Sequence, residues 1–333
     1  MASSEMELRQ RREGKEEVAK EGLRPRDAGP GGEQASRPTG EWVHAAVALV
    51  VVGIITYLTT PANLTAREPT PLHVWYYGWI TALSTGLGAV PLLMWSKPSD
   101  FWLGASNAIA AGMMLSASFS LVSEGIALDE DNAMILGNPL SHAMRVGAGM
   151  AAGMGFVVVT KSWVEGFEDL KLGDITGLDA GKILLIMSVM TLHSFAEGLG
   201  IGVSFVGKGG SQLGAFISAS LAVHNVPEGL AVALVLVPRG VSPLKTLAWA
   251  VCSSLPQPIV AVPVFMFVEH FEPWQSAGLG FAAGAMLWVA CFELIADALK
   301  EMTLPAFSFS ISFSFAGMML ISSFIDVATA HAT

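Results

Sequence analysis

Charged residues are scarce in this chain of 333 residues, because Asp, Glu, Lys and Arg together make up only 14% of it. In a soluble domain about 25% of the residues are charged, since water must hydrate its surface. The mean hydropathy is +0.55, and residues 1–41 hold a large share of the charges. The rest of the chain is too apolar to face water, which excludes an ordinary soluble protein.

Cysteines and basic residues are also few. The two cysteines, Cys252 and Cys291, lie inside apolar runs, so the sequence contains neither a disulfide framework nor a CxxC metal motif. Acidic residues outnumber basic ones by 28 to 18, and the formal net charge is −10. Because phosphate binding requires a basic surface, a nucleic-acid partner is excluded as the default.

The chain is rich in long apolar stretches. Nine of them follow residues 1–41, and each is near or above the roughly 20 residues that a helix needs to cross a bilayer. They cover approximately residues 42–60, 72–95, 102–125, 139–160, 181–205, 211–237, 244–268, 274–299 and 304–328. Residues 307–314 alternate as a strand would, but an open strand leaves backbone groups unpaired in lipid. We therefore predict an all-α, polytopic membrane helix bundle.

The distribution of charge predicts the orientation of this bundle. Residues 1–41 are rich in Arg, Glu, Gly and Pro, which predicts a disordered tail. The stretch 42–60 is short enough for a signal-peptide core, but a 41-residue leader is long for one, so we expect a retained helix. With a cytosolic tail and nine spans, 15 of the 18 Lys and Arg residues lie on the cytosolic side. The positive-inside rule therefore predicts a cytosolic N-terminus.

Two short sequence echoes suggest internal repeats. The segment 110–115 (AAGMML) recurs as 282–287 (AAGAML), and 193–198 (HSFAEG) recurs as 224–229 (HNVPEG). The members of each pair are separated by an odd number of predicted crossings, so they run in opposite directions. Inverted repeats are common in transporters, which bind their substrate near the midplane between the repeats.

The second echo carries the residues with metal-binding chemistry. His193 and Glu197 are four apart, as are His224 and Glu228, so each pair shares one helix face. Both pairs lie roughly 18–20 Å into their stretches, near the bilayer centre. An unpaired carboxylate there costs about 2.5–3.5 kcal/mol, and a divalent cation would offset that cost. Two imidazoles and two carboxylates suit Zn²⁺ and are tolerable for Fe²⁺ or Mn²⁺.

The residues around the two pairs support close helix packing. Pro227 removes one backbone hydrogen bond, which should bend the helix beside the ligands. A glycine follows each glutamate, and we expect these two glycines to let the two helices approach and share one ion.

Three other roles compete with metal transport. Each Glu could be protonated and hydrogen-bonded to a His, so that the pair only holds two helices together. Duplication of the pair favours a transport site instead. An intramembrane zinc hydrolase would use Glu197 or Glu228 as its general base. The HExxH motif of such enzymes is absent, and a duplicated site suits alternating access better, so we expect no enzymatic activity. A metal-sensing receptor without ion flux is the third alternative.

The two His-x-x-x-Glu-Gly helices resemble the signature helices of the ZIP family (zinc- and iron-regulated transporter-like proteins), most closely its GufA-like branch. The resemblance covers about residues 72–328 and implies eight core transmembrane helices with inverted repeats, with 42–60 as an extra N-terminal one. It implies a metal site formed by His193, Glu197, His224 and Glu228, with a nearby contact from Met114.

The resemblance also implies what the protein carries. Its substrate would be a divalent transition-metal ion moving toward the cytosol, zinc first, with iron, manganese or cadmium as alternatives, and no cofactor is implied. The bilayer surrounds such a protein, and family members often form homodimers. Both the plasma membrane and an endomembrane remain open as locations.

The sequence departs from the family pattern near the expected site. Some members hold a second ion with polar and acidic residues, but this chain has Ser194, Asn225 and Gln257 at those positions. None is charged, so we predict a single ion. Ala196 replaces a proline that is common in this branch, and the loop 162–180 lacks the histidine cluster of many members.

A second acidic pair lies near the predicted cytosolic end of the eighth stretch. Glu293 and Asp297 are again four residues apart, and the family often has a Glu at this point. The pair would either receive metal that leaves the central site or consist of ordinary interfacial acids.

Overall fold

The computed structural model of the chain describes residues 39–64, 68–94, 99–128, 134–135, 138–165, 178–207, 209–268 and 272–332. Residues 1–38 of the predicted disordered tail and most of the loop 162–180 lie outside these ranges, whereas residues 39–41 are helical and begin the first described helix, so the tail ends earlier than predicted. Residues Ala45–Thr333 form one compact unit.

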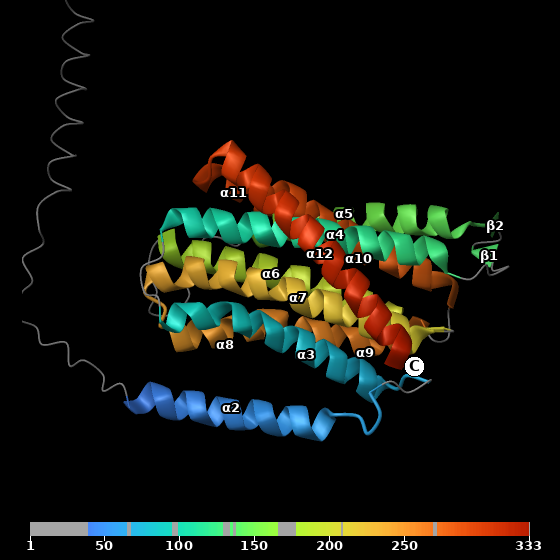
Figure 1. The fold of residues 1–333 in the computed structure, drawn as a ribbon, viewed down its shortest axis with the longest axis horizontal. Helices are drawn as coiled ribbons and strands as arrows, with labels where there is room; N and C mark the ends of the chain where they lie inside the picture. The colour runs from blue at the N-terminus through green and yellow to red at the C-terminus, as the bar shows by residue number, and fades with distance from the viewer. Residues whose placement is uncertain are drawn as a thin grey trace, which may run out of the picture. The chain divides into compact units, whose positions relative to one another are not determined.

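Helices dominate the described part of the chain (Figure 1). The α-helices are α2 (Thr39–Thr59), α3 (Pro71–Ala89), α4 (Asp100–Ala127), α5 (His142–Glu165), α6 (Leu178–Ser204), α7 (Gly210–Leu236), α8 (Pro243–Ser254), α9 (Pro256–Val268), α10 (Gln275–Val289), α11 (Ile295–Glu301) and α12 (Leu304–Ala332). Short 3₁₀ turns are η1 (Val90–Leu93), η2 (Val237–Arg239) and η3 (Glu272–Trp274), and η4 (Ala290–Leu294) is a π-helical segment. Two-residue strands β1 (Met134–Ile135) and β2 (Asn138–Pro139) pair antiparallel.

Each predicted apolar stretch coincides with one helix or with two consecutive helices. Six described segments are long and apolar enough to cross a membrane, with α8–α9 and α10–α11 counted as one each. The last stretch, with its alternating serines, is helical in α12. The chain is therefore a multi-pass helical membrane protein.

Two predicted continuous helices are interrupted, which the sequence pattern did not indicate. The stretch 244–268 breaks at Leu255, where Pro256 begins α9. A proline ring lacks an N–H and clashes with the carbonyl one turn earlier, so it readily starts a new helix. The stretch 274–299 contains the π-helical segment η4. Pro227, in contrast, lies inside α7, which stays helical throughout.

The helix contacts of the bundle come in matched sets. Helix α3 packs on α7 and α9 packs on α6, while α4 packs on α12 and α10 packs on α5. Likewise α4 contacts α7 and α10 contacts α6. Exchanging α3 with α9, α4 with α10, α5 with α12 and α6 with α7 turns each of these six contacts into another of the six. The two sequence echoes fall on the exchanged pairs α4/α10 and α6/α7.

The glycines after the two glutamates do not serve the contact that the sequence suggested. A Cβ atom on Gly229 of α7 would lie 1.7 Å from the carbonyl oxygen of Thr85 in α3. A Cβ atom on Gly198 of α6 would lie 2.7 Å from the carbonyl oxygen of Gln257 in α9. The expectation that these glycines join α6 to α7 is therefore wrong. Gly229 lets α7 pack closely on α3, and Gly198 lets α6 pack closely on α9, because only a hydrogen atom fits at each contact.

Candidate metal site

The four His and Glu residues of the duplicated signature lie where α6 and α7 pack together. A short connection with positive φ at Gly207 and Gly209 reverses the chain between the two helices. Glycine tolerates such angles without steric cost, so the two signatures run antiparallel and face one another. All four side chains are buried, with exposed fractions of 1% for His193, 0% for Glu197 and His224, and 3% for Glu228.

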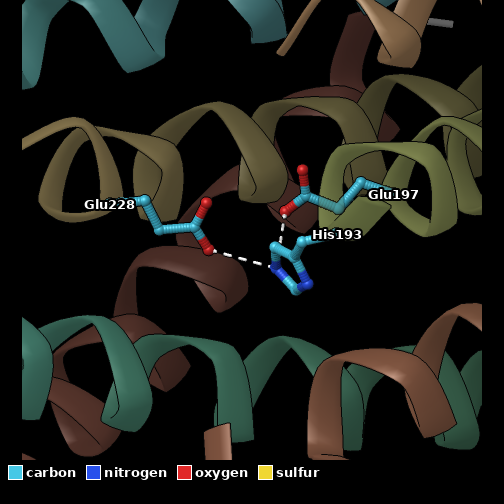
Figure 2. A group of neighbouring side chains, drawn as sticks. All are labelled: His193, Glu197 and Glu228. Atoms are coloured by element: carbon cyan, nitrogen blue, oxygen red, sulfur yellow. Dashed lines mark ion pairs between the residues drawn. The ribbon is translucent and has the colours of Figure 1, made fainter. Parts of the chain in front are cut away.

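Three of these side chains converge closely enough to hold one ion (Figure 2). Ligand atoms of His193, Glu197 and Glu228 all lie within 4.8 Å of one another. His193 Nε2 is 3.3 Å from Oε1 of Glu228 and 3.5 Å from Oε1 of Glu197. Zinc bonds of about 2.0–2.1 Å in a tetrahedron place neighbouring ligand atoms about 3.3 Å apart. These two distances are therefore close to the edges of a tetrahedral zinc site.

His224 lies beside this group with a different role. Its Nε2 atom is 2.8 Å from Oε1 of Glu197 and 3.8 Å from Oε1 of Glu228. If Nε2 carries a proton, it donates a hydrogen bond to Glu197, and the same nitrogen cannot bind metal at that moment. The fourth predicted ligand is thus in reach of both carboxylates but engaged with one of them.

Several buried polar atoms at the site make no hydrogen bond to the described residues. Among them are both ring nitrogens of His193, Nδ1 of His224 and Oε1 of Glu228, together with the side-chain oxygens of Asn225 and Gln257. A buried polar group without a partner costs about 1–3 kcal/mol, and more when it is charged. A divalent cation bound between Nε2 of His193 and Oε1 of Glu228 would supply a partner for these two atoms, so the donor set fits zinc.

Of the three neutral residues that the sequence singled out, one contacts a carboxylate of the site. Gln257 of α9 is buried and donates from Nε2 to Oε2 of Glu197 at 2.5 Å. Asn225 donates from Nδ2 to the carbonyl oxygen of Thr81 in α3 at 3.1 Å. Ser194 is buried on α6. The sequence showed only that Gln257 is uncharged, whereas the structure shows that it anchors one of the two carboxylates.

The remaining candidate residues are not among the three whose ligand atoms converge. Met114 is fully buried in the large apolar core that also contains Ala196. Glu293 and Asp297 do not share a ligand position, because each pairs with its own lysine. Lys161 Nζ is 3.1 Å from Oε1 of Glu293, and Lys300 Nζ is 2.6 Å from Oδ1 of Asp297.

Comparison with known proteins identifies the family of the chain. Residues 168–325, which contain both signatures, match the family model described as ZIP zinc transporter. The zinc transporter GufA of Myxococcus xanthus is 33% identical over 223 residues, which cover 66% of this chain and 85% of that protein. The zinc transporter ZIPB of Bordetella bronchiseptica is 30% identical over 259 residues, or 75% of this chain and 79% of that protein.

A plant relative extends the comparison. A candidate zinc transporter of Arabidopsis thaliana is 40% identical over 245 residues, which cover 74% of this chain. The match spans only 38% of that longer protein. The family consists of divalent-metal transporters rather than enzymes, which sets the zinc hydrolase alternative aside. From its matched family model, its relatives and its buried His/Glu cluster, the chain belongs to the ZIP family of zinc transporters.

Proposed function

We propose that this protein carries Zn²⁺ across a bilayer toward the cytosol through a site formed by His193, Glu197, His224 and Glu228. The observation that supports this proposal most directly is the convergence of ligand atoms from buried side chains on two antiparallel helices. Nothing in a soluble or purely structural helix contact requires two imidazoles and two carboxylates at one buried point. Fe²⁺, Mn²⁺ and Cd²⁺ accept similar ligands and are the alternative substrates.

The charge of the site limits it to one ion in this proposal. Two carboxylates balance one Zn²⁺, and the adjacent Gln257, Asn225 and Ser194 add no charge. A second Zn²⁺ would leave two positive charges in a low-dielectric interior, which is strongly unfavourable.

Binding requires an exchange of partners within the site. The ion takes the place of the proton between His224 and Oε1 of Glu197, where the two atoms are 2.8 Å apart. His193 and Glu228 already stand at a distance typical of neighbouring zinc ligands. Loading therefore needs a small rearrangement of His224 and little movement of the other pair.

The path through the membrane follows the proposed topology. Eight core helices from 72 to 328 and an additional helix at 42–60 place the N-terminus in the cytosol by the positive-inside rule. The matched helix contacts agree with two inverted repeats whose interface holds the site. Homodimer formation is proposed from the family resemblance alone, as is location in the plasma membrane or an endomembrane.

Zinc uptake into proteoliposomes tests the proposal. Purified full-length protein is reconstituted with a zinc-sensitive dye trapped inside, and zinc is added outside. We expect saturable uptake by the wild-type protein and none by Glu228→Ala, with Glu301→Gln, an exposed acid, as the matched control. Zinc binding without uptake would instead support a receptor, and uptake by Glu228→Ala at wild-type rate would exclude the proposed site.

A further inference from the structure

A second, partly buried ion pair joins α5 to the π-helical segment η4. Lys161 of α5 and Glu293 of the π-helical segment η4 approach to 3.1 Å, with side-chain exposed fractions of 28% and 16%. The Lys161 ammonium also lies 5.2 Å from the ring centroid of Trp288 in α10. A carboxylate and an aromatic face therefore both hold this cation in place.

Glu293 belongs to a segment that packs against the helix carrying half of the metal site. Helix α10 leads directly into η4, which contains Glu293, and α10 packs against α6, the helix of His193 and Glu197. The π-helical segment continues into α11, which lies against Gly104 near the beginning of α4 at one end of the bundle (Figure 1). Glu293 thus lies between the buried cluster and that end. π-Helical segments occur frequently at functional positions.

An unpaired carboxylate at this position would hinder transport. Glu293 is mostly removed from water, so its attraction for a divalent ion is screened far less than that of a surface acid. An ion that leaves the central site would be held at Glu293, and its release would slow. Paired with Lys161, the carboxylate has no net charge to offer, and the ion has to exchange with a tethered ammonium that returns when the ion departs.

We propose that Lys161 is a positioning residue of the transport cycle, a tethered counter-cation that neutralises Glu293 and so speeds release of the metal at the α11 end. The inference rests on the proposed transport function and on the route past Glu293. The neighbouring Lys300–Asp297 pair does not share this role, because its side chains are 68% and 56% exposed and water already screens them.

Zinc-uptake kinetics in proteoliposomes test this inference. Lys161→Met keeps the length and apolar stem of the side chain but removes the charge. We expect its maximal rate and its KM to fall together by roughly five-fold, because only the release step slows. Lys161→Arg retains the cation and should keep wild-type kinetics. Glu293→Gln should not lower KM, since no carboxylate remains to retain the ion.

The double variant and a matched control complete the design. Lys161→Met combined with Glu293→Gln should recover the wild-type KM, while Lys300→Met should leave both kinetic parameters unchanged. Lys161→Gln, which keeps a polar side chain, repeats the test in a second background. Wild-type kinetics for Lys161→Met, or a lowered rate with an unaltered KM as general damage would give, would overturn the role of Lys161. Absence of uptake by the wild-type protein would instead overturn the transport proposal itself.

Discussion

His224 of α7 is closer to Glu197 of α6 than is His193, which lies one turn away on the same helix. The separations from Oε1 of Glu197 are 2.8 Å for His224 Nε2 and 3.5 Å for His193 Nε2. Glu197 also accepts a hydrogen bond from Gln257 of α9, whereas Oε1 of Glu228 has no hydrogen-bond partner among the described residues. One carboxylate is therefore anchored by two other helices, and the second is freer to follow an ion.

Removal of either less constrained ligand should abolish transport. We expect His193→Ala and Glu228→Ala to lose zinc uptake while the protein still inserts, because each deletes one ligand from a buried site that offers few replacements. Uptake into proteoliposomes at matched protein levels is the measurement. Normal transport by both variants would contradict the assignment of the site.

A methyl group on Gly229 should damage the site without touching a ligand. In Gly229→Ala the new Cβ would lie 1.7 Å from the carbonyl oxygen of Thr85, so α7 must move away from α3 and carry Glu228 with it. Overpacking of this kind costs about 1–3 kcal/mol, and backbone on both sides leaves little room to relax. We expect a lower unfolding temperature in detergent together with weaker zinc binding.

Gly155→Ala is the matched control for this substitution. Gly155 lies in α5 and has no neighbouring atom within 4 Å of an added Cβ. Its unfolding temperature should stay at or slightly above that of the wild type, because alanine favours a helix over glycine. Equal stability of the Gly229 and Gly155 variants would show that α7 does not require the close contact with α3.

Acidification should weaken zinc binding. Imidazoles must be neutral and carboxylates ionised to bind the metal, so protons compete directly with zinc at all four side chains. Affinity should therefore be highest near neutral pH and decrease as the pH falls. Titration of zinc affinity from about pH 7.5 to about pH 5.5 provides the measurement. An affinity that does not change over this interval would argue against His and Glu as ligands.

The central site should hold one zinc ion rather than two. Gln257 donates a hydrogen bond to Glu197, so it is oriented as a neutral donor and adds no negative charge for a second ion. Gln257→Glu should create that charge and raise the affinity for a second ion. Anomalous scattering from crystals, or elemental analysis of purified protein, gives the stoichiometry. Two ions about 4 Å apart in the unaltered chain would refute the charge argument.

The sequence alone was sufficient for the helical membrane class, the position of each long apolar stretch and the two candidate His/Glu pairs. These features are local, because hydrophobic length and four-residue spacing are properties of one continuous segment. The family signature is likewise carried by two short motifs. No contact between distant segments was needed to identify them.

Tertiary structure decided which of these groups meet. Glu197 bonds to His224 and Gln257, Gly229 seats against Thr85, and Lys161 pairs with Glu293, all across different helices. Helical periodicity indicates which residues share a face, but not which neighbour that face contacts. Those partners depend on how the whole bundle packs, because only its combined geometry brings residues from distant segments within hydrogen-bonding distance.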